Sequence, residues 1–163
     1  MKELSLNILD ITENSVKAGA TLTKISIVES GDTLTLTIKD DGHGMSDDIL
    51  KTVENPFYTT RTTRKVGMGI PLLKLAAEQT GGSLSIKSVT ADEDPLGHGT
   101  VVCATFHTDS IDFTPVGDMV STMCVIIQGH PEIDYVFRHK TPVIDVSLET
   151  SEMREVLGEG ISL

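Results

Sequence analysis

The chain has 163 residues, and 39% of them are hydrophobic, which suits one ordinary domain with a buried core and argues against a disordered or fibrous protein. No apolar run approaches the roughly 18 residues that a membrane span needs, and the N-terminus lacks the pattern of a signal peptide, so we expect a cytoplasmic protein without a membrane partner. Thirteen basic and 24 acidic residues give a formal charge of −11, which argues against broad binding of nucleic acid.

The first third of the chain predicts a helix, a hairpin and a loop. Residues 3–18 carry apolar positions near helical spacing and are followed by a glycine. Residues 23–30 and 33–40 alternate apolar and polar side chains around a Gly-Asp turn, which is typical of a β-hairpin. A glycine-rich loop at 40–45 then leads into a short helix over 46–53.

The next segment has no clear period and carries several basic residues, over 55–66. Residues 67–82 predict a glycine turn, a helix with proline in its first turn, and a glycine stop. Two further strands are expected at 83–89 and 99–106.

A change in charge balance follows residue 106, because residues 1–106 sum to −4 (10 basic, 14 acidic) and residues 107–163 sum to −7 (3 basic, 10 acidic). This tail predicts a helix at 118–129, strands at 133–139 and 142–148, and a helix at 150–158. We expect it to pack on the first domain rather than to fold alone.

The cysteines and histidines give no sign of a metal site. Cys103 and Cys124 lack CxxC spacing and lie in apolar runs, so we expect two buried thiols of a reducing compartment. The five histidines show no metal-ligand spacing.

The first helix carries one candidate site. Asp10, Asn14 and Lys17 lie at i, i+4 and i+7 and therefore share one face. A carboxylate, an amide oxygen and an ammonium on one stripe suit hydrated Mg²⁺ and phosphate oxygens. A solvated surface face is the alternative that the helix alone leaves open.

Three glycine motifs follow along the chain. In DDGHG, at 40–44, a carboxylate beside two close glycines can accept hydrogen bonds from a flat ligand, although a polar turn would use the same residues. The GMG at 67–69 opens a helix, where free N–H groups form an anion site. The GHGT at 97–100 is by itself also compatible with a plain hairpin turn.

The order and spacing of these motifs together resemble the GHKL superfamily of ATP-binding domains, over residues 4–106. That superfamily includes gyrase-type and heat-shock-type ATPases, histidine kinases, MutL-type repair proteins and anti-sigma kinases. The resemblance implies the Bergerat fold, an α+β two-layer sandwich whose mixed, largely antiparallel sheet has helices on one face and ATP between the layers. Residues 1–106 would form this domain, and 107–163 a small α/β extension that packs on it or forms a dimer contact.

The resemblance also implies roles for single residues. Asn14 corresponds to the Mg²⁺ ligand, Lys17 to a phosphate-contacting lysine, and Asp40 to the acceptor of the adenine amino group. Thr100 takes the adenine-side position at the last glycine motif, and PFYTTR resembles the segment before a short lid. The remaining implied nucleotide contacts are Gly42, Gly44, Met45, Thr60, Arg61, Lys65, Gly67, Met68, Gly69 and Ile70.

Two positions depart from the family pattern. ATPase members of the MutL and gyrase type carry glutamate as general base where this chain has Asp10, which is one methylene shorter. Lys65 stands where a glycine usually begins the second glycine motif, and it can reach a phosphate as a point charge or stay in solvent. Arg61 and Arg64 can close over the γ-phosphate or remain exposed lid charges.

Several functions of the superfamily do not fit the positions of these motifs along the chain. The first motif begins near residue 10, so we expect no self-contained sensor histidine kinase. The segment at 55–66 is short and no large transducer domain follows, so we do not expect gyrase, chaperone or mismatch-repair functions.

Three functions remain open: an anti-sigma-like kinase that phosphorylates a partner protein, a slow ATPase switch, and a non-catalytic ATP sensor. Each uses ATP or ADP and an unidentified protein partner, and a homodimer also stays open. The tail resembles small stand-alone ATPase-like proteins encoded beside iron-only hydrogenase genes in anaerobic bacteria.

Overall fold

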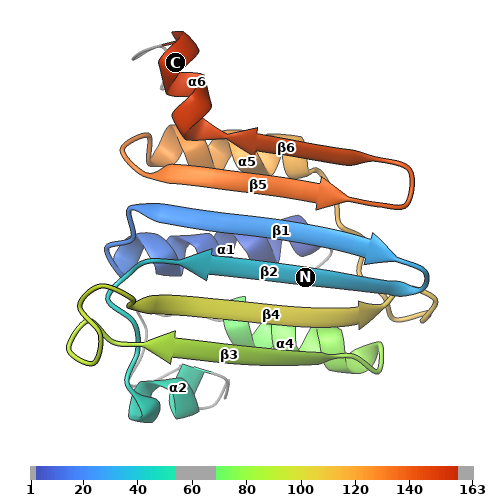
Figure 1. Cartoon of the computed structure of the whole chain (residues 1–163). Coiled ribbons are helices and arrows are strands. Elements are labelled where there is room, and N and C mark those ends of the chain that lie inside the picture. Colours follow the sequence, from blue (N-terminus) through green and yellow to red (C-terminus); the bar gives the residue numbers. More distant parts are fainter. Residues whose placement is uncertain (1–2, 54–68, 158–163) are drawn as a thin grey trace.

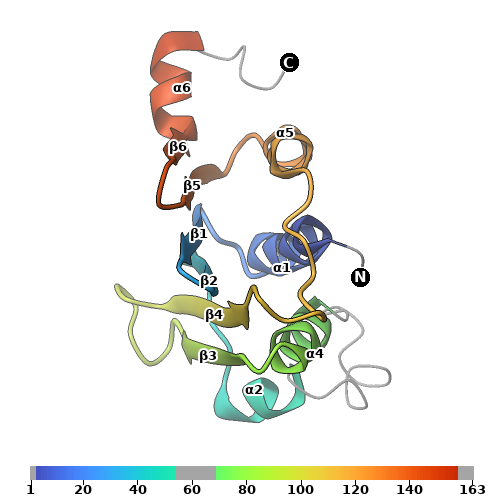
Figure 2. The same cartoon turned by 90° about the vertical axis from the view of Figure 1, so that its right-hand side faces the viewer.

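All described strands form one six-stranded sheet, and helices cover one of its faces (Figures 1 and 2). The computed structural model describes residues 3–53 and 69–157. Its strands are β1 (Leu22–Ser30), β2 (Thr33–Asp40), β3 (Ser83–Val89), β4 (Gly99–His107), β5 (Asp134–Lys140) and β6 (Asp145–Glu149). Its helices are α1 (Leu4–Lys17), α2 (Asp47–Val53), α4 (Gly69–Gln79), α5 (Met119–Gly129) and α6 (Thr150–Leu157).

The sheet is mixed and largely antiparallel, in the order β3-β4-β2-β1-β5-β6. Among the described strand pairs, β1–β5 is the parallel one and the others are antiparallel. Figure 2 shows α1, α4 and α5 on one face, α2 beyond the β3 edge, and α6 beyond β6. The predicted α+β sandwich is therefore confirmed, including the hairpin of β1 and β2, in which Ser30 pairs with Thr33 across the turn.

The core forms between the sheet and the helices because the strands alternate. Ile25 and Ile27 of β1, and Leu34, Leu36 and Ile38 of β2, point toward the helices and are buried. The matching stripe of α1 contains Leu4, Ile8 and Ile11, which are also buried. Burying these apolar side chains stabilises the two-layer arrangement by about 25 cal/mol for each Å² removed from water.

The segment after β4 continues the same sheet and core. β5 pairs in parallel with β1, and Ile126, Ile133 and Tyr135 belong to the main hydrophobic core. The connection before α5 also holds the start of α1, where the N-cap Glu3 makes no side-chain capping bond to any described residue. The N–H groups of Leu4 and Ser5 donate to the carbonyl oxygens of residues 115 and 116, each at 2.8 Å, and this satisfies two donors that a helix start leaves free.

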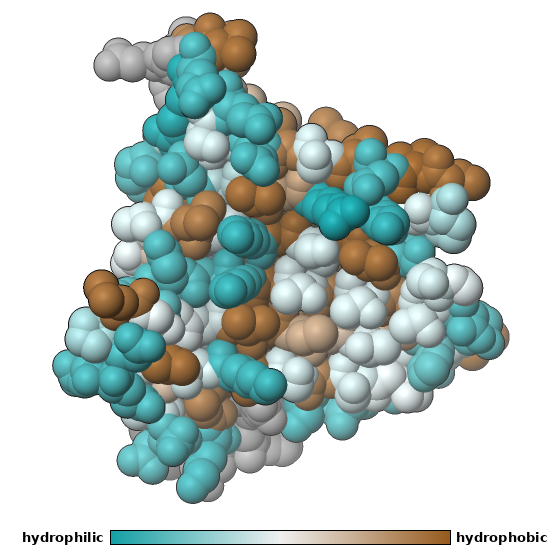
Figure 3. All heavy atoms as spheres, in the orientation of Figure 1, coloured by the Kyte–Doolittle hydropathy of each residue, from teal (hydrophilic) through white to brown (hydrophobic). Residues whose placement is uncertain are grey.

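The opposite face of the sheet is covered by none of the described helices, and Figure 3 shows it as mostly pale and hydrophilic with scattered hydrophobic patches. Cys103 lies on that face, because its strand neighbours Val102 and Ala104 point inward, and it is half-buried. Cys124 lies on the outer side of α5 and is exposed, since Met123 and Ile126 take the inner side. The prediction of two buried thiols was therefore wrong.

None of the described helices is both long enough and apolar enough to cross a membrane.

Candidate functional site

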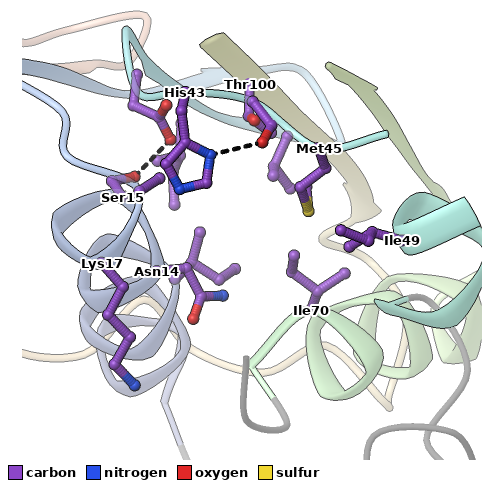
Figure 4. Close-up of a pocket in the computed structure, with 14 residues that line it drawn as sticks. Asn14, Ser15, Lys17, His43, Met45, Ile49, Ile70 and Thr100 are labelled. Atoms are coloured by element: carbon purple, nitrogen blue, oxygen red, sulfur yellow. Dashed lines mark hydrogen bonds between the residues drawn. The ribbon is translucent and has the colours of Figure 1, made fainter. Parts of the chain in front are cut away.

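A pocket of about 270 Å³ opens between the C-terminal half of α1, the sheet and the loop after β2 (Figure 4). Seven of its lining residues were predicted from the sequence: Asn14, Lys17, Asp40, Gly44, Met45, Ile70 and Thr100. The other seven were not predicted as site residues: Ile11, Ser15, Ala18, Ile38, His43, Ile49 and Val102. The pocket wall is thus largely apolar, which suits a flat aromatic ligand.

Asp40 places a carboxylate in this apolar pocket, at the last position of β2. Its Oδ1 accepts a hydrogen bond from the Gly42 N–H at 2.9 Å, and its Oδ2 accepts one from the Ser15 hydroxyl at 2.7 Å. The two donors fix the carboxylate plane, and each oxygen retains a lone pair for a ligand. Gly42 is not itself a lining residue, so the structure gives it the role of holding Asp40.

The loop after Asp40 needs its two glycines because other chain segments lie so close. A Cβ at Gly42 would come within 2.7 Å of the Ala18 Cβ. Gly44 has φ +78°, and a Cβ there would lie 2.1 Å from the Val89 carbonyl oxygen. The loop therefore packs closely against the end of α1 on one side and against β3 on the other. On the α1 side, the His43 N–H donates a hydrogen bond to the Ala18 carbonyl oxygen at 2.8 Å.

Thr100 and Met45 are joined by a serine that sequence reasoning missed. The Met45 N–H donates to Ser88 Oγ at 2.7 Å, and Ser88 Oγ and Thr100 Oγ1 share a hydrogen bond at 2.8 Å. This pair holds Met45 at the pocket wall. Ser88 lies in an ordinary alternating strand, so the sequence carried no signal for its role.

Asn14 and Lys17 lie on α1 at the pocket, as their shared helix face predicted. Among the described residues, the buried Asn14 Nδ2 has no hydrogen-bond partner, so this NH2 group can donate to a ligand. Figure 4 shows the Lys17 side chain extending away from His43 and Thr100.

Asp10 lies one turn before Asn14 but does not line the pocket. It contacts the start of α4, where a Cβ added to Gly69 would lie 3.0 Å from the Asp10 Cβ. Desolvation and the negative charge of Glu13 raise the pKa of the Asp10 carboxyl above its ordinary value. Gly69 opens α4 beside Asp10 and, unlike Ile70, is not a lining residue.

The remaining predicted site residues lie outside the described residues: Thr60, Arg61, Lys65, Gly67 and Met68. The same holds for Arg64 and for the segment 55–66 that resembles a lid.

The sequence profile of one family, described as "Histidine kinase-, DNA gyrase B-, and HSP90-like ATPase", matches residues 2–110. The chain belongs to this family. The expected GHKL assignment is thereby confirmed, and the chain contains a nucleotide-binding region of the ATPase type.

Curated relatives of this GHKL chain are histidine kinases. Sporulation kinase C of Bacillus subtilis is 28% identical over 88 residues, which cover 54% of this chain and 20% of the kinase. A sensor-like histidine kinase of Rhizobium meliloti is 32% identical over 111 residues, which cover 63% of this chain and 20% of the relative. The chain thus spans about a fifth of the length of these relatives.

Solved structures share the fold of this GHKL chain at low sequence identity. The Aquifex aeolicus MutL ATPase domain, solved in complex with ADP, superposes with a TM-score of 0.63 at 14% identity, over 99% of this chain and 69% of that one. The N-terminal domain of a DNA repair protein gives a TM-score of 0.57 at 17% identity, over 91% of this chain and 52% of that one. At these identities the likeness concerns the fold.

Proposed function

We propose that this chain binds ATP with Mg²⁺ in the pocket beside α1 and transfers the γ-phosphate to a hydroxyl of a partner protein, as anti-sigma serine kinases do. The placement of the Asp40 carboxylate is the observation that best supports nucleotide binding. Its carboxylate, held by two donors inside an apolar pocket, suits a flat base with an amino group, and adenine is such a base.

The residues present also fit a magnesium ion bound together with a nucleotide. Asn14 places a side-chain amide at the pocket, and its Oδ1 is the atom that would coordinate the ion, because the NH2 group only donates hydrogen bonds. Among residues 3–53 and 69–157, no three His, Cys, Asp or Glu side chains gather into a metal site. An ion at Asn14 would therefore take its other ligands from phosphate oxygens and water, as Mg²⁺ in nucleotide sites does. When bound, the ion would neutralise charge on the phosphates.

Asp10 lies beside the pocket rather than in its wall, one turn before Asn14 on α1 and against the start of α4, and from there it is the proposed general base. In the transfer, the hydroxyl oxygen of the partner forms a bond to the γ-phosphorus while the bond from that phosphorus to the β–γ bridging oxygen breaks, and ADP leaves. The proton of the hydroxyl passes to Asp10. The raised pKa of Asp10 brings this carboxyl nearer to the operating pH, which favours a base.

The first experiment is a calorimetric titration of ATP with Mg²⁺ into the wild-type chain and into Asp40→Asn. The variant replaces an acceptor that meets the adenine amino group by an amide that can present a donor, so we expect Kd to rise by at least about 10-fold. Asp32→Asn is the matched control. It removes the same charge at the other end of the β1–β2 hairpin, so its Kd should equal that of the wild type.

A second experiment separates transfer from binding. The chain is incubated with ATP labelled at the γ-phosphate and with extract fractions, and we expect label on a protein in the wild-type reaction and none with Asp10→Asn, which still binds ATP. Release of phosphate without labelled protein would indicate a slow ATPase switch instead of a kinase. Binding with neither product would leave a nucleotide sensor, and no binding to the wild type would overturn the proposal.

A further inference from the structure

The Ser15 hydroxyl joins α1 to the carboxylate of Asp40, although the two residues lie 25 positions apart. We propose that Ser15 is a positioning residue that fixes this carboxylate and thereby makes the pocket select 6-amino purines over 6-oxo purines. The inference rests on the proposed nucleotide binding and extends it to the choice of base.

The contact is short, and its serine end is buried. Ser15 is 2% exposed and lines the pocket, and its Oγ lies 2.7 Å from Asp40 Oδ2. The other carboxylate oxygen accepts from the Gly42 N–H at 2.9 Å. A helix residue and a loop residue thus hold the two oxygens from different sides, and the torsion that would otherwise rotate the carboxylate freely is restricted.

With this arrangement, Ser15 and Asp40 both present acceptor atoms to a ligand. The hydroxyl hydrogen of Ser15 is used on Asp40, so Ser15 Oγ can only accept a further hydrogen bond. Asp40 as a carboxylate also only accepts. The amino group of adenine offers donors to these oxygens, whereas the 6-oxo oxygen of hypoxanthine or guanine would face them with no hydrogen between, which is unfavourable in a buried site.

The hydrogen bond from Ser15 to Asp40 maintains this preference for 6-amino over 6-oxo purines. Without the Ser15 hydroxyl, Asp40 keeps one holding donor and can turn away from an oxo group or admit a water molecule between them. Asn14 is the neighbour of Ser15 on α1, and its side chain does not depend on the Ser15 hydroxyl in any described contact. Loss of the hydroxyl should therefore alter base selection and leave the Mg²⁺ dependence of binding unchanged.

The test compares Kd for ATP and for inosine triphosphate, each with and without Mg²⁺, for wild type, Ser15→Ala and Thr12→Ala. Thr12 is the matched control, because it is also a buried hydroxyl of α1 but donates to the Ile8 carbonyl at 2.7 Å and does not line the pocket. Thermal unfolding without nucleotide verifies that each variant is folded.

We expect wild type and Thr12→Ala to prefer ATP by at least about 10-fold, the effect of one mismatched buried hydrogen bond. Ser15→Ala should bind ATP about 2- to 10-fold more weakly and lose most of the preference, with the Mg²⁺ effect retained. An unchanged ATP-to-inosine-triphosphate ratio in Ser15→Ala would overturn this inference while nucleotide binding stands, as would an equal loss in Thr12→Ala. Binding of neither nucleotide to the wild type would instead overturn the proposed function.

Discussion

Gly44→Ala tests the placement of the pocket loop against β3. Gly44 has φ +78°, a region that side chains with a Cβ avoid. A Cβ there would lie 2.1 Å from the Val89 carbonyl oxygen, 2.6 Å from the Val89 carbonyl carbon and 2.9 Å from the Thr90 Cα. All three are backbone atoms, so no side chain can rotate out of the way. Either the loop or the end of β3 must move.

The loss of stability in Gly44→Ala can be divided into a backbone conformational part and a packing part by comparison with Gly19→Ala. Gly19 has φ +75°, nearly the same value, and an added Cβ would meet no atom of the described residues within 4 Å. Gly19→Ala therefore measures the conformational penalty alone, about 1 kcal/mol. Gly44→Ala adds overpacking against backbone, which typically costs about 1–3 kcal/mol. We expect a total loss of about 2–4 kcal/mol in the free energy of unfolding.

Urea unfolding of the two variants and the wild type measures these losses, provided that the m-values agree. Because Met45 donates to Ser88 and Ala91 donates to His43 across this same contact, the shift should also displace the pocket wall, and ATP binding to Gly44→Ala should weaken by at least about 10-fold. If Gly44→Ala unfolds at the same urea concentration as Gly19→Ala, the close approach of the loop to Val89 is refuted.

Two further predictions concern titrating groups. Partial burial acts to raise the pKa of Asp41, but hydrogen bonds from Thr21 and its neighbour outweigh this and hold the pKa below its ordinary value. Asp41→Ala should therefore cost about 1–3 kcal/mol at pH 7, and in urea titrations the difference from wild type should disappear as pH falls through that lowered pKa. A constant difference down to pH 2 would contradict this. Burial, with the carboxylates of Glu132 and Glu13, raises the pKa of Tyr135 to about 12. Since an unfolded tyrosine ionises near pH 10, wild-type stability should fall between about pH 10 and 12 and that of Tyr135→Phe should fall less. At pH 7 the variant should be as stable as wild type, because the buried hydroxyl has no hydrogen-bond partner in the described part of the chain, and a loss above about 1 kcal/mol would refute this.

Local patterns predicted the elements well, because each pattern depends on residues close in sequence. The alternation in 23–30 and 33–40 is enough to specify a hairpin, and the structure pairs these strands residue by residue. The stripe of Asp10, Asn14 and Lys17 follows from helical geometry alone, and two of the three line the pocket. Asp10 does not, since the start of α4 lies against it, and no local pattern reports a neighbour from a distant helix.

The cysteines also show that local sequence patterns do not predict long-range packing. Apolar sequence neighbours suggested burial for Cys103 and Cys124, yet both belong to elements with one inner and one outer side. Which side faces the core depends on the packing partner. Cys103 falls on the sheet face that the described helices leave uncovered, and Cys124 on the outer side of α5.

The sequence by itself indicated the family, the order of the elements and half of the residues that line the pocket, because glycine motifs, helix faces and strand alternation are local features of the chain. Only the tertiary structure decided that β5 enters the sheet beside β1, that Ser15 holds Asp40, and that Ser88 joins Met45 to Thr100. Each of these contacts brings together segments that lie far apart in the sequence. Their formation depends on which surfaces the whole fold buries against each other, and a pattern within one short segment cannot predict that packing.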